Sequence, residues 1–198
     1  KVIEKMGDKD MSRRTMKAAG VPVIPGCDLV KDLGHGLKEA EKIGFPLLIK
    51  ARSGGGGRGI KLVNEASEFE KNFRLAVSEA ESAFGDGEVY LEKFLKPVKH
   101  IEMQILADNF GNVVCLGERD CSIQRKNQKM IEESPSGAVS AETREKMTEI
   151  SVVAARAADY RGAGTIEYLL DKDGNFYFME MNTRIQVEHP VTEMVTWI

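Results

Sequence analysis

The residues best suited to chemistry lie in one short run near the end of the chain, residues 180–188. Taken with a period of two, this run places polar side chains on one face: Glu180, Asn182, Arg184, Gln186 and Glu188. The other face carries Met181, Thr183, Ile185 and Val187. Such alternation is typical of an extended, half-buried segment. A solvated surface strand is the ordinary interpretation, but this polar face has no lysine and pairs oxygen donors for a hard cation with a guanidinium for a planar anion.

The strand that precedes this run adds another carboxylate. Residues 165–170 and 176–180 are strand-like, and the Asp-Gly break between them predicts a hairpin. Depending on the register, Glu167 then comes opposite Met179 or Glu180. Carboxylates that face each other across strands repel, so we expect a cation between them.

These observations indicate a site for Mg²⁺ shared with a phosphate. Glu167, Glu180 and Asn182 offer oxygen ligands from a rigid platform, which suits this ion. Arg184 follows on the same face, where its forked guanidinium is suited to hold a small oxyanion.

Composition limits the other function classes. The 198 residues carry 28 basic and 31 acidic side chains, a formal net charge of −3, so no bulk field favours a nucleic-acid partner. No apolar run reaches the roughly 20 residues that span a bilayer. Three cysteines without CxxC spacing, Cys27, Cys115 and Cys121, are typical of free thiols in a reducing compartment, so we expect a cytoplasmic location. We expect the chain to be a piece of a longer protein, because it begins without Met and ends directly after an apolar run.

The first half of the chain predicts a helix at 8–19, a Pro-rich connector at 21–26 and a small α+β unit over 24–94. The elements expected in this unit are helices at 32–43 and 67–83 and strands at 47–51, 60–63 and 88–94.

A glycine run, residues 54–59, lies between two of these strands. A strand rather than a helix follows it, so it is neither a dinucleotide fingerprint nor a Walker A loop. Ordering four consecutive glycines costs backbone entropy, which favours a flap whose N–H groups close over phosphates. The residues expected there are Gly55, Gly56, Gly57, Arg58 and, at the flap entrance, Lys50.

The second half predicts a mainly antiparallel sheet. Strands are expected at 100–106 and 113–122, joined by a turn at 109–112, and a helix at 140–159. His100, Glu102 and Gln104 share one face of the first strand. Residues 123–138 are polar and basic, and we interpret them as irregular.

Together these segments resemble the biotin carboxylases, members of the ATP-grasp group. The matching stretches, in the family's order, are 50–59, 92–93, 100–102, 118–125, 161–167 and 180–193. The run Glu-Met-Asn-Thr-Arg-Ile-Gln-Val-Glu-His-Pro is the most specific of them.

The resemblance implies an α+β ATP-grasp fold in three parts. Residues 1–23 would form a helix and linker, 24–94 the small lid subdomain with the flap, and 95–198 the larger, truncated subdomain with a mainly antiparallel sheet. ATP would lie between lid and sheet.

The resemblance also implies a role for each matching residue. Lys9 and Lys50 would contact phosphates, Glu92 and Lys93 the adenine, and His100 and Gln124 the ribose. Glu167, Glu180 and Asn182 would hold Mg²⁺ (or Mn²⁺). Arg184, Gln186 and the backbone of Val187 would bind bicarbonate, Glu188 would be the base that deprotonates it, and Lys129 would stabilise charge on the transferred phosphate. Asn127 stands where many relatives have His and Lys126 where they have Arg, so we expect altered nucleotide contacts.

The implied reaction is the ATP-dependent carboxylation of biotin through carboxyphosphate. The biotin would sit on a carboxyl carrier protein or domain, and carboxyltransferase subunits, as in acetyl-CoA carboxylase and fatty acid biosynthesis, would use the product. The parent would be a homodimer, and this piece, which lacks the complete biotin site, would be inactive alone. Two alternatives stay open: another bicarbonate-activating ligase such as a carbamoyl-phosphate synthetase, and an ATP-binding module without turnover.

Overall fold

The computed structural model describes residues 6–54, 59–126 and 128–198, without the side chain of Lys9. The chain divides into two compact units, Ile24–Leu95 and Lys1–Val23 together with Lys96–Ile198. Each unit has a hydrophobic core of its own.

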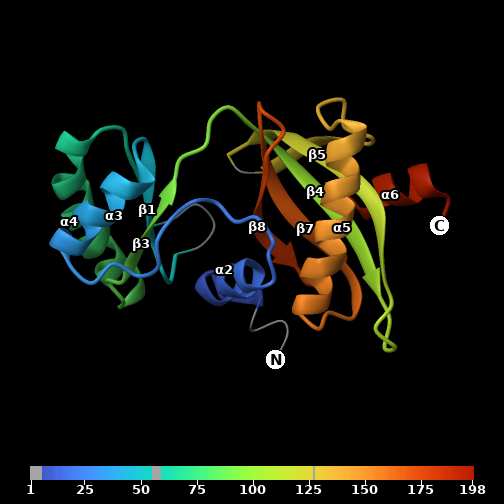
Figure 1. The fold of residues 1–198 in the computed structure, drawn as a ribbon, viewed down its shortest axis with the longest axis horizontal. Coiled ribbons are helices and arrows are strands. Elements are labelled where there is room, and N and C mark those ends of the chain that lie inside the picture. Colours follow the sequence, from blue (N-terminus) through green and yellow to red (C-terminus); the bar gives the residue numbers. More distant parts are fainter. Residues whose placement is uncertain (1–5, 55–58, 127) are drawn as a thin grey trace. The chain divides into compact units, whose positions relative to one another are not determined.

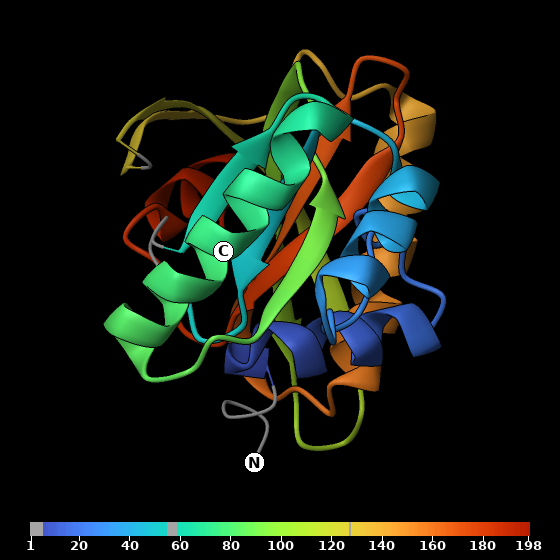
Figure 2. The ribbon, with the colours of Figure 1, turned by 90° about the vertical axis from the view of Figure 1, so that its left-hand side faces the viewer.

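The smaller unit is a three-stranded antiparallel sheet covered by two helices. Its elements are α3 (Leu33–Ile43), β1 (Leu47–Ala51), β2 (Ile60–Val63), α4 (Ala66–Phe84) and β3 (Val89–Lys93). The strand order is β2-β1-β3, and α3 and α4 lie side by side over one face (Figure 2).

Helix α4 shows why this sequence forms this layer. Phe69, Phe73, Ala76 and Ala80 recur at helical spacing and are all buried. Phe69, Phe73 and Ala76 pack with the β1 side chains Leu47 and Ile49 in the core of the smaller unit. Gly85, in the left-handed conformation with φ 69°, ends the helix.

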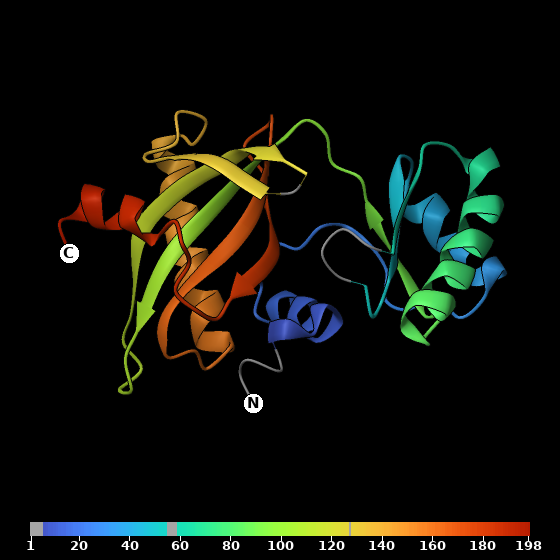
Figure 3. The same ribbon diagram turned by 180° about the vertical axis from the view of Figure 1, so that it is seen from behind.

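The larger unit is a five-stranded antiparallel sheet in the order β6-β5-β4-β7-β8. Its elements are α2 (Lys9–Ala18), β4 (Val98–Ala107), β5 (Val113–Arg125), β6 (Gln128–Glu133), α5 (Ala141–Ala157), β7 (Gly162–Asp171), β8 (Phe176–Asn182) and α6 (His189–Thr196). Helix α5 lies along one face of the sheet (Figure 1), and α6 lies on the other (Figure 3).

The two faces of this sheet differ in character. Ile101, Met103 and Ile105 of β4 are buried in the core of the larger unit, which also holds Met147 and Ala154 of α5. Their neighbours in sequence point to the opposite face, as the period of two requires. There the sheet carries His100, Glu102 and Gln104, the polar face predicted from the sequence. In the described part of the chain, the helices are all too short or too polar to cross a membrane.

Two sequence-based predictions are wrong. Residues 123–138 are not simply irregular, because β5 extends to Arg125 and pairs with β6 as an antiparallel hairpin. The extended segment predicted over 180–188 ends at Asn182, and a loop leads from there into α6. Ile185 and Val187, expected on a half-buried face, are 61% and 92% exposed. The alternation stops because this loop turns the chain toward α6, so strand periodicity no longer applies.

Candidate functional site

The β7–β8 hairpin places two carboxylates directly opposite each other. Glu167 pairs with Glu180, the second of the two predicted registers, and Tyr168 pairs with Phe178. Met179 is therefore an extra residue, a β-bulge that shifts the phase of the strand. Because of this shift Phe178 is buried in the core, whereas Glu180 lies beside Glu167 on the polar face.

Asn182 completes this corner of the sheet. It lies opposite Thr165 in the ladder, and its amide nitrogen donates to Oε1 of Glu167 at 2.8 Å. The three residues predicted to hold Mg²⁺ are thus brought together on one face.

Lys129 of β6 joins three carboxylates from three different elements. Its ammonium lies 3.0 Å from Glu167 Oε1 and 2.7 Å from Glu188 Oε1, and it also donates to Glu102. Burial alone would lower the pKa of Lys129, but the charge of Glu167 and the hydrogen bonds to Glu102 and Glu188 raise it well above its usual value. Lys129 therefore stays charged and ties the sheet to the start of α6.

His100 and Gln124 form a short chain of hydrogen bonds that ends on Glu167. The Gln124 amide nitrogen lies 2.7 Å from Nδ1 of His100, and Nε2 of His100 lies 2.6 Å from Glu167 Oε2. If the amide donates to Nδ1, the ring proton is on Nε2 and points at the carboxylate.

Neighbouring hydrogen-bond donors and positive charge keep the carboxylates ionised. Burial would raise the pKa of Glu167, but His100 and Lys129 lower it to about 2. Burial likewise opposes ionisation of Glu188, and Lys129 lowers its pKa below the usual value. At neutral pH both side chains are therefore ionised and accept hydrogen bonds.

Arg119 is the residue of this face that the sequence-based assignment missed. Its side chain is fully buried and contacts Glu102, Gln104, Thr165, Gln186 and Thr192. The sequence did contain a signal for it. Residues 118–120 are three charged residues in succession inside a strand of the sheet, so at least one of these side chains must lie on a buried face and pair with another charge there.

The predicted bicarbonate residues differ in their surroundings. Gln186 is buried, with Nε2 3.3 Å from Glu167 Oε1 and Oε1 3.1 Å from Arg119 Nη2. Arg184 is exposed, and its guanidinium donates to the carbonyl oxygen of Ile185 at 3.1 Å. Val187 is also exposed. Gln186 therefore belongs to the hydrogen-bonded network of the polar face, whereas the side chains of Arg184 and Val187 are exposed to solvent.

Three predicted nucleotide contacts lie in the smaller unit. Lys50 of β1 forms an ion pair with Glu92 of β3, and Lys93 donates to the carbonyl oxygen of Phe45 at 2.8 Å. The predictions for Gly55, Gly56, Gly57, Arg58 and Asn127, and for the side chain of Lys9, lie outside the described residues.

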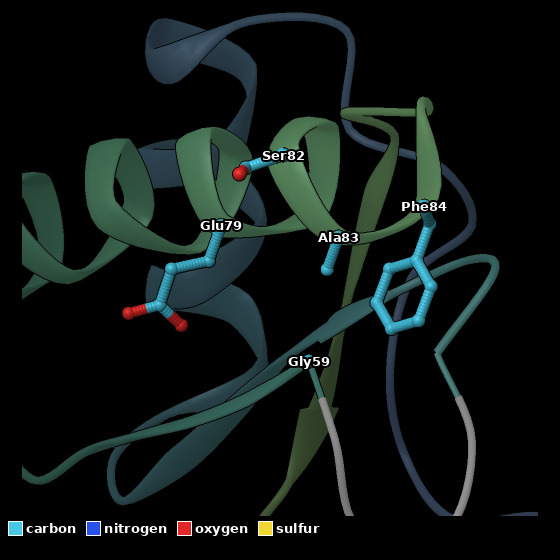
Figure 4. Close-up of a pocket in the computed structure, with 5 residues that line it drawn as sticks. All are labelled: Gly59, Glu79, Ser82, Ala83 and Phe84. Atoms are coloured by element: carbon cyan, nitrogen blue, oxygen red, sulfur yellow. The ribbon is translucent and has the colours of Figure 1, made fainter.

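Two other features do not add to this site. A pocket of the smaller unit is lined by Gly59, Glu79, Ser82, Ala83 and Phe84 (Figure 4). Of the expected flap it contains only the last glycine, Gly59, and it contains none of the residues to which a ligand contact was assigned. Glu102, Cys121 and Glu132 offer ligand atoms within 4.8 Å of one another, but Lys129 and Arg119 already neutralise Glu102.

The donor set of the polar face fits Mg²⁺. Glu167, Glu180 and Asn182 supply carboxylate and amide oxygens, the hard donors that this ion prefers. The facing carboxylates of Glu167 and Glu180 repel each other, and a bound divalent ion would offset this repulsion.

Comparison with known proteins gives a family match and close relatives. The family model described as carbamoyl-phosphate synthase L chain, ATP binding domain, matches residues 8–198. The chain is 59% identical over 197 residues to a biotin carboxylase of Nostoc sp., which covers 99% of this chain and 44% of that protein.

Two solved structures are similar throughout the chain. A biotin carboxylase–beta-gamma-ATP complex from Campylobacter jejuni is 49% identical, with a TM-score of 0.91, over 100% of this chain and 44% of that one. The biotin carboxylase domain dimer of Hydrogenobacter thermophilus 2-oxoglutarate carboxylase, in complex with MgADP, ADP and bicarbonate, is 52% identical, with a TM-score of 0.89, over 100% and 44%. The chain thus spans less than half of the length of these relatives.

Proposed function

The chain belongs to the carbamoyl-phosphate synthase L chain ATP-binding domain family, and from this we propose that it is the ATP- and bicarbonate-binding part of a biotin carboxylase. The parent protein would use MgATP and bicarbonate to carboxylate biotin on a carrier protein or domain. Relatives described as binding MgADP and bicarbonate support this substrate pair.

The cluster around Lys129 is the observation that carries the proposal. Glu188, an ionised carboxylate beside an ammonium, would take the proton of bicarbonate. Since the pKa of Glu188 is lowered, this transfer is favourable only if nearby positive charge also makes the bound bicarbonate more acidic. Lys129 supplies such charge, and the exposed guanidinium of Arg184 is free of buried partners to meet the anion.

The deprotonated bicarbonate would then attack the γ-phosphorus of ATP. A bond forms between the bicarbonate oxygen and phosphorus, the bond to the β-phosphate oxygen breaks, and ADP leaves with carboxyphosphate as the other product. Such transfers depend on positioning and charge stabilisation. Lys129 would stabilise the charge on the transferred group, and Gln186 would orient the anion.

A divalent ion bound with ATP would be held by Glu167, Glu180 and Asn182. When bound, it neutralises phosphate charge. The nucleotide contacts of Lys50, Glu92, Lys93, His100 and Gln124 belong to the same proposal.

Carboxyphosphate would split into CO₂ and phosphate. The ureido nitrogen of biotin would lose its proton, for which the released phosphate is an acceptor, and would bond to the CO₂. The final acceptor, whether acetyl-CoA as in acetyl-CoA carboxylase or a keto acid, would be set by carboxyltransferase subunits or domains. The biotin carboxylase dimer among the relatives supports a dimeric parent.

The decisive test measures ADP release by the full-length parent. We expect release that requires both Mg²⁺ and bicarbonate and that free biotin stimulates. Release without bicarbonate, or unaffected by biotin, would contradict the proposal.

Related measurements distinguish this proposal from the two alternatives, a carbamoyl-phosphate synthetase and an ATP-binding module without turnover. A carbamoyl-phosphate synthetase, the enzyme for which the matching family model is named, would respond to ammonia rather than biotin. For the 198-residue chain alone we expect calorimetry to detect MgATP binding without phosphate release.

A further inference from the structure

Arg119 uses every hydrogen-bond donor that a guanidinium has. Nε donates to Glu102 Oε1 at 2.6 Å, Nη1 to Gln104 Oε1 at 2.9 Å and Thr192 Oγ1 at 2.6 Å, and Nη2 to Thr165 Oγ1 at 3.3 Å and Gln186 Oε1 at 3.1 Å. The five acceptors come from β4, β7, α6 and the loop that precedes α6. A guanidinium presents five donors in a rigid plane, so these contacts fix the acceptors relative to one another.

The contact with Gln186 sets the direction of its amide. Because Arg119 holds the oxygen, the amide nitrogen faces Glu167 at 3.3 Å. A flipped amide would place N–H groups against the guanidinium, donor against donor, inside a buried site. Only one of the two amide hydrogens is needed for Glu167, so the other can be offered to an oxyanion.

A second route leads from Arg119 to the proposed base. Glu102, which has no exposed side-chain surface, accepts from Arg119 with one oxygen and from Lys129 with the other. Lys129 in turn contacts Glu188. The direction of the Lys129 ammonium therefore depends on Arg119 through the Glu102 carboxylate.

We propose that Arg119 is a positioning residue for bicarbonate, acting through Gln186 and through Glu102 and Lys129 without touching the substrate. This inference rests on the proposed function, because it needs bicarbonate to bind at Gln186. Lysine could not replace arginine, since an ammonium carries its three donors on one nitrogen atom and cannot reach five acceptors that come from four different segments.

The test compares Arg119→Lys with wild type in the full-length parent. We expect the KM for bicarbonate to rise about tenfold or more, the effect of losing a buried charged hydrogen bond, while the KM for MgATP changes by less than about twofold. KM does not depend on the fraction of folded enzyme, so a merely structural role would lower apparent kcat and leave both KM values unchanged.

Arg144→Lys is the matched control. Arg144 lies on α5 and contacts Glu118, the residue before Arg119, at 2.8 Å. Its hydrogen bonds go to Glu118, Ser136 and Val139 and not to the residues of the polar face. We expect an unchanged bicarbonate KM for this variant. An equal rise in both variants would overturn the inference.

A Gln186→Ala variant separates this inference from the proposed function. It should raise the bicarbonate KM, and adding Arg119→Lys should then raise it by a smaller factor than in the wild-type background, because the route through Gln186 is already lost and only the route through Glu102 and Lys129 remains. If Gln186→Ala has no effect, the proposed bicarbonate site is wrong. If it has the expected effect and Arg119→Lys does not, only the role of Arg119 is wrong.

Thr192→Val keeps the test decisive if Arg119→Lys does not fold. This change removes one acceptor of Arg119 at nearly constant volume, and we expect a rise of about threefold in the bicarbonate KM. An unchanged KM in this variant would overturn the role of Arg119.

Discussion

The polar face of the larger unit gathers carboxylates around two fixed cations. Lys129 contacts Glu102, Glu167 and Glu188, and Arg119 contacts Glu102. Glu180 lies directly opposite Glu167 in the β7–β8 ladder, and a bound divalent ion would offset the repulsion between these two carboxylates. The cations also keep Glu188 ionised.

Glu188→Gln removes the proposed base with little change in shape. In the full-length parent we expect kcat to fall by about 100-fold or more, the usual contribution of general base catalysis, with MgATP affinity retained. Steady-state kinetics and calorimetry measure the two quantities. Glu193→Gln changes a carboxylate that is 54% exposed on α6, the helix that begins directly after Glu188, and should behave as wild type. If both variants retain full kcat, Glu188 is not the base.

Glu180→Gln removes one ligand from the proposed ion site. We expect the gain in ATP affinity on adding Mg²⁺ to shrink by about tenfold, because one charged oxygen donor is lost. Calorimetric titrations with and without Mg²⁺ measure this gain directly, apart from turnover. Glu133→Gln, on the exposed edge of β6, is the control. An unchanged Mg²⁺ dependence in Glu180→Gln would remove this residue from the site.

At the scale of elements, periodicity in the sequence predicted which residues share a face of one helix or strand. It did not predict how strands pair with one another. The helix at 67–83 and the face shared by His100, Glu102 and Gln104 follow from spacing alone, and both are confirmed. The β6 strand has no such signal, because its residues alternate weakly and are mostly exposed. Only pairing with β5 reveals it, and with it the position of Lys129.

The bulge at Met179 illustrates the same limit. Phe178 and Met181 are both in the core although they are three positions apart, an odd spacing that a strict period of two does not allow. The sequence therefore left two registers open for Glu167, and the ladder selects the one that brings it opposite Glu180. The resemblance to biotin carboxylases, by contrast, depends on local motifs and is confirmed by the relatives.

Asp120 links β5 to the segment that leads to α5. Its carboxylate accepts from the Ser122 backbone at 3.0 Å and from the Ser136 hydroxyl at 2.9 Å. Burial would raise the pKa of Asp120, but these hydrogen bonds and Lys99 lower it. A lowered pKa in the folded state adds stability above the unfolded pKa, and this is lost as pH falls through the folded value.

Asp120→Asn should therefore destabilise the parent by about 1–3 kcal/mol near pH 7, less as the pH falls below about 4. Denaturant unfolding at several pH values measures the difference from wild type. Asp173→Asn, in the exposed turn between β7 and β8, should leave stability unchanged throughout. A difference for Asp120→Asn that stays constant with pH would contradict a role for its charge.

At the scale of the whole chain, two separate cores support one ATP-grasp fold. The α+β ATP-grasp fold predicted from the resemblance is confirmed by the solved relatives. The smaller core centres on Phe69, Leu47 and Leu91, the larger on Ile101, Met147 and Ile166. Since each core is built from its own elements, damage to one should remain largely confined to its unit.

Phe69→Ala tests this expectation. Phe69 is fully buried, and such a change costs about 3–5 kcal/mol. In the parent we expect faster hydrogen exchange at the amides of β1, β3 and α4, with protection retained in β4 and β7. Met147→Ala, equally buried in the other core, should give the reverse pattern, because it removes packing under α5 instead. Equal loss of protection in both units from either variant would mean that the two cores unfold as one, and the energetic separation argued from their contacts would be wrong.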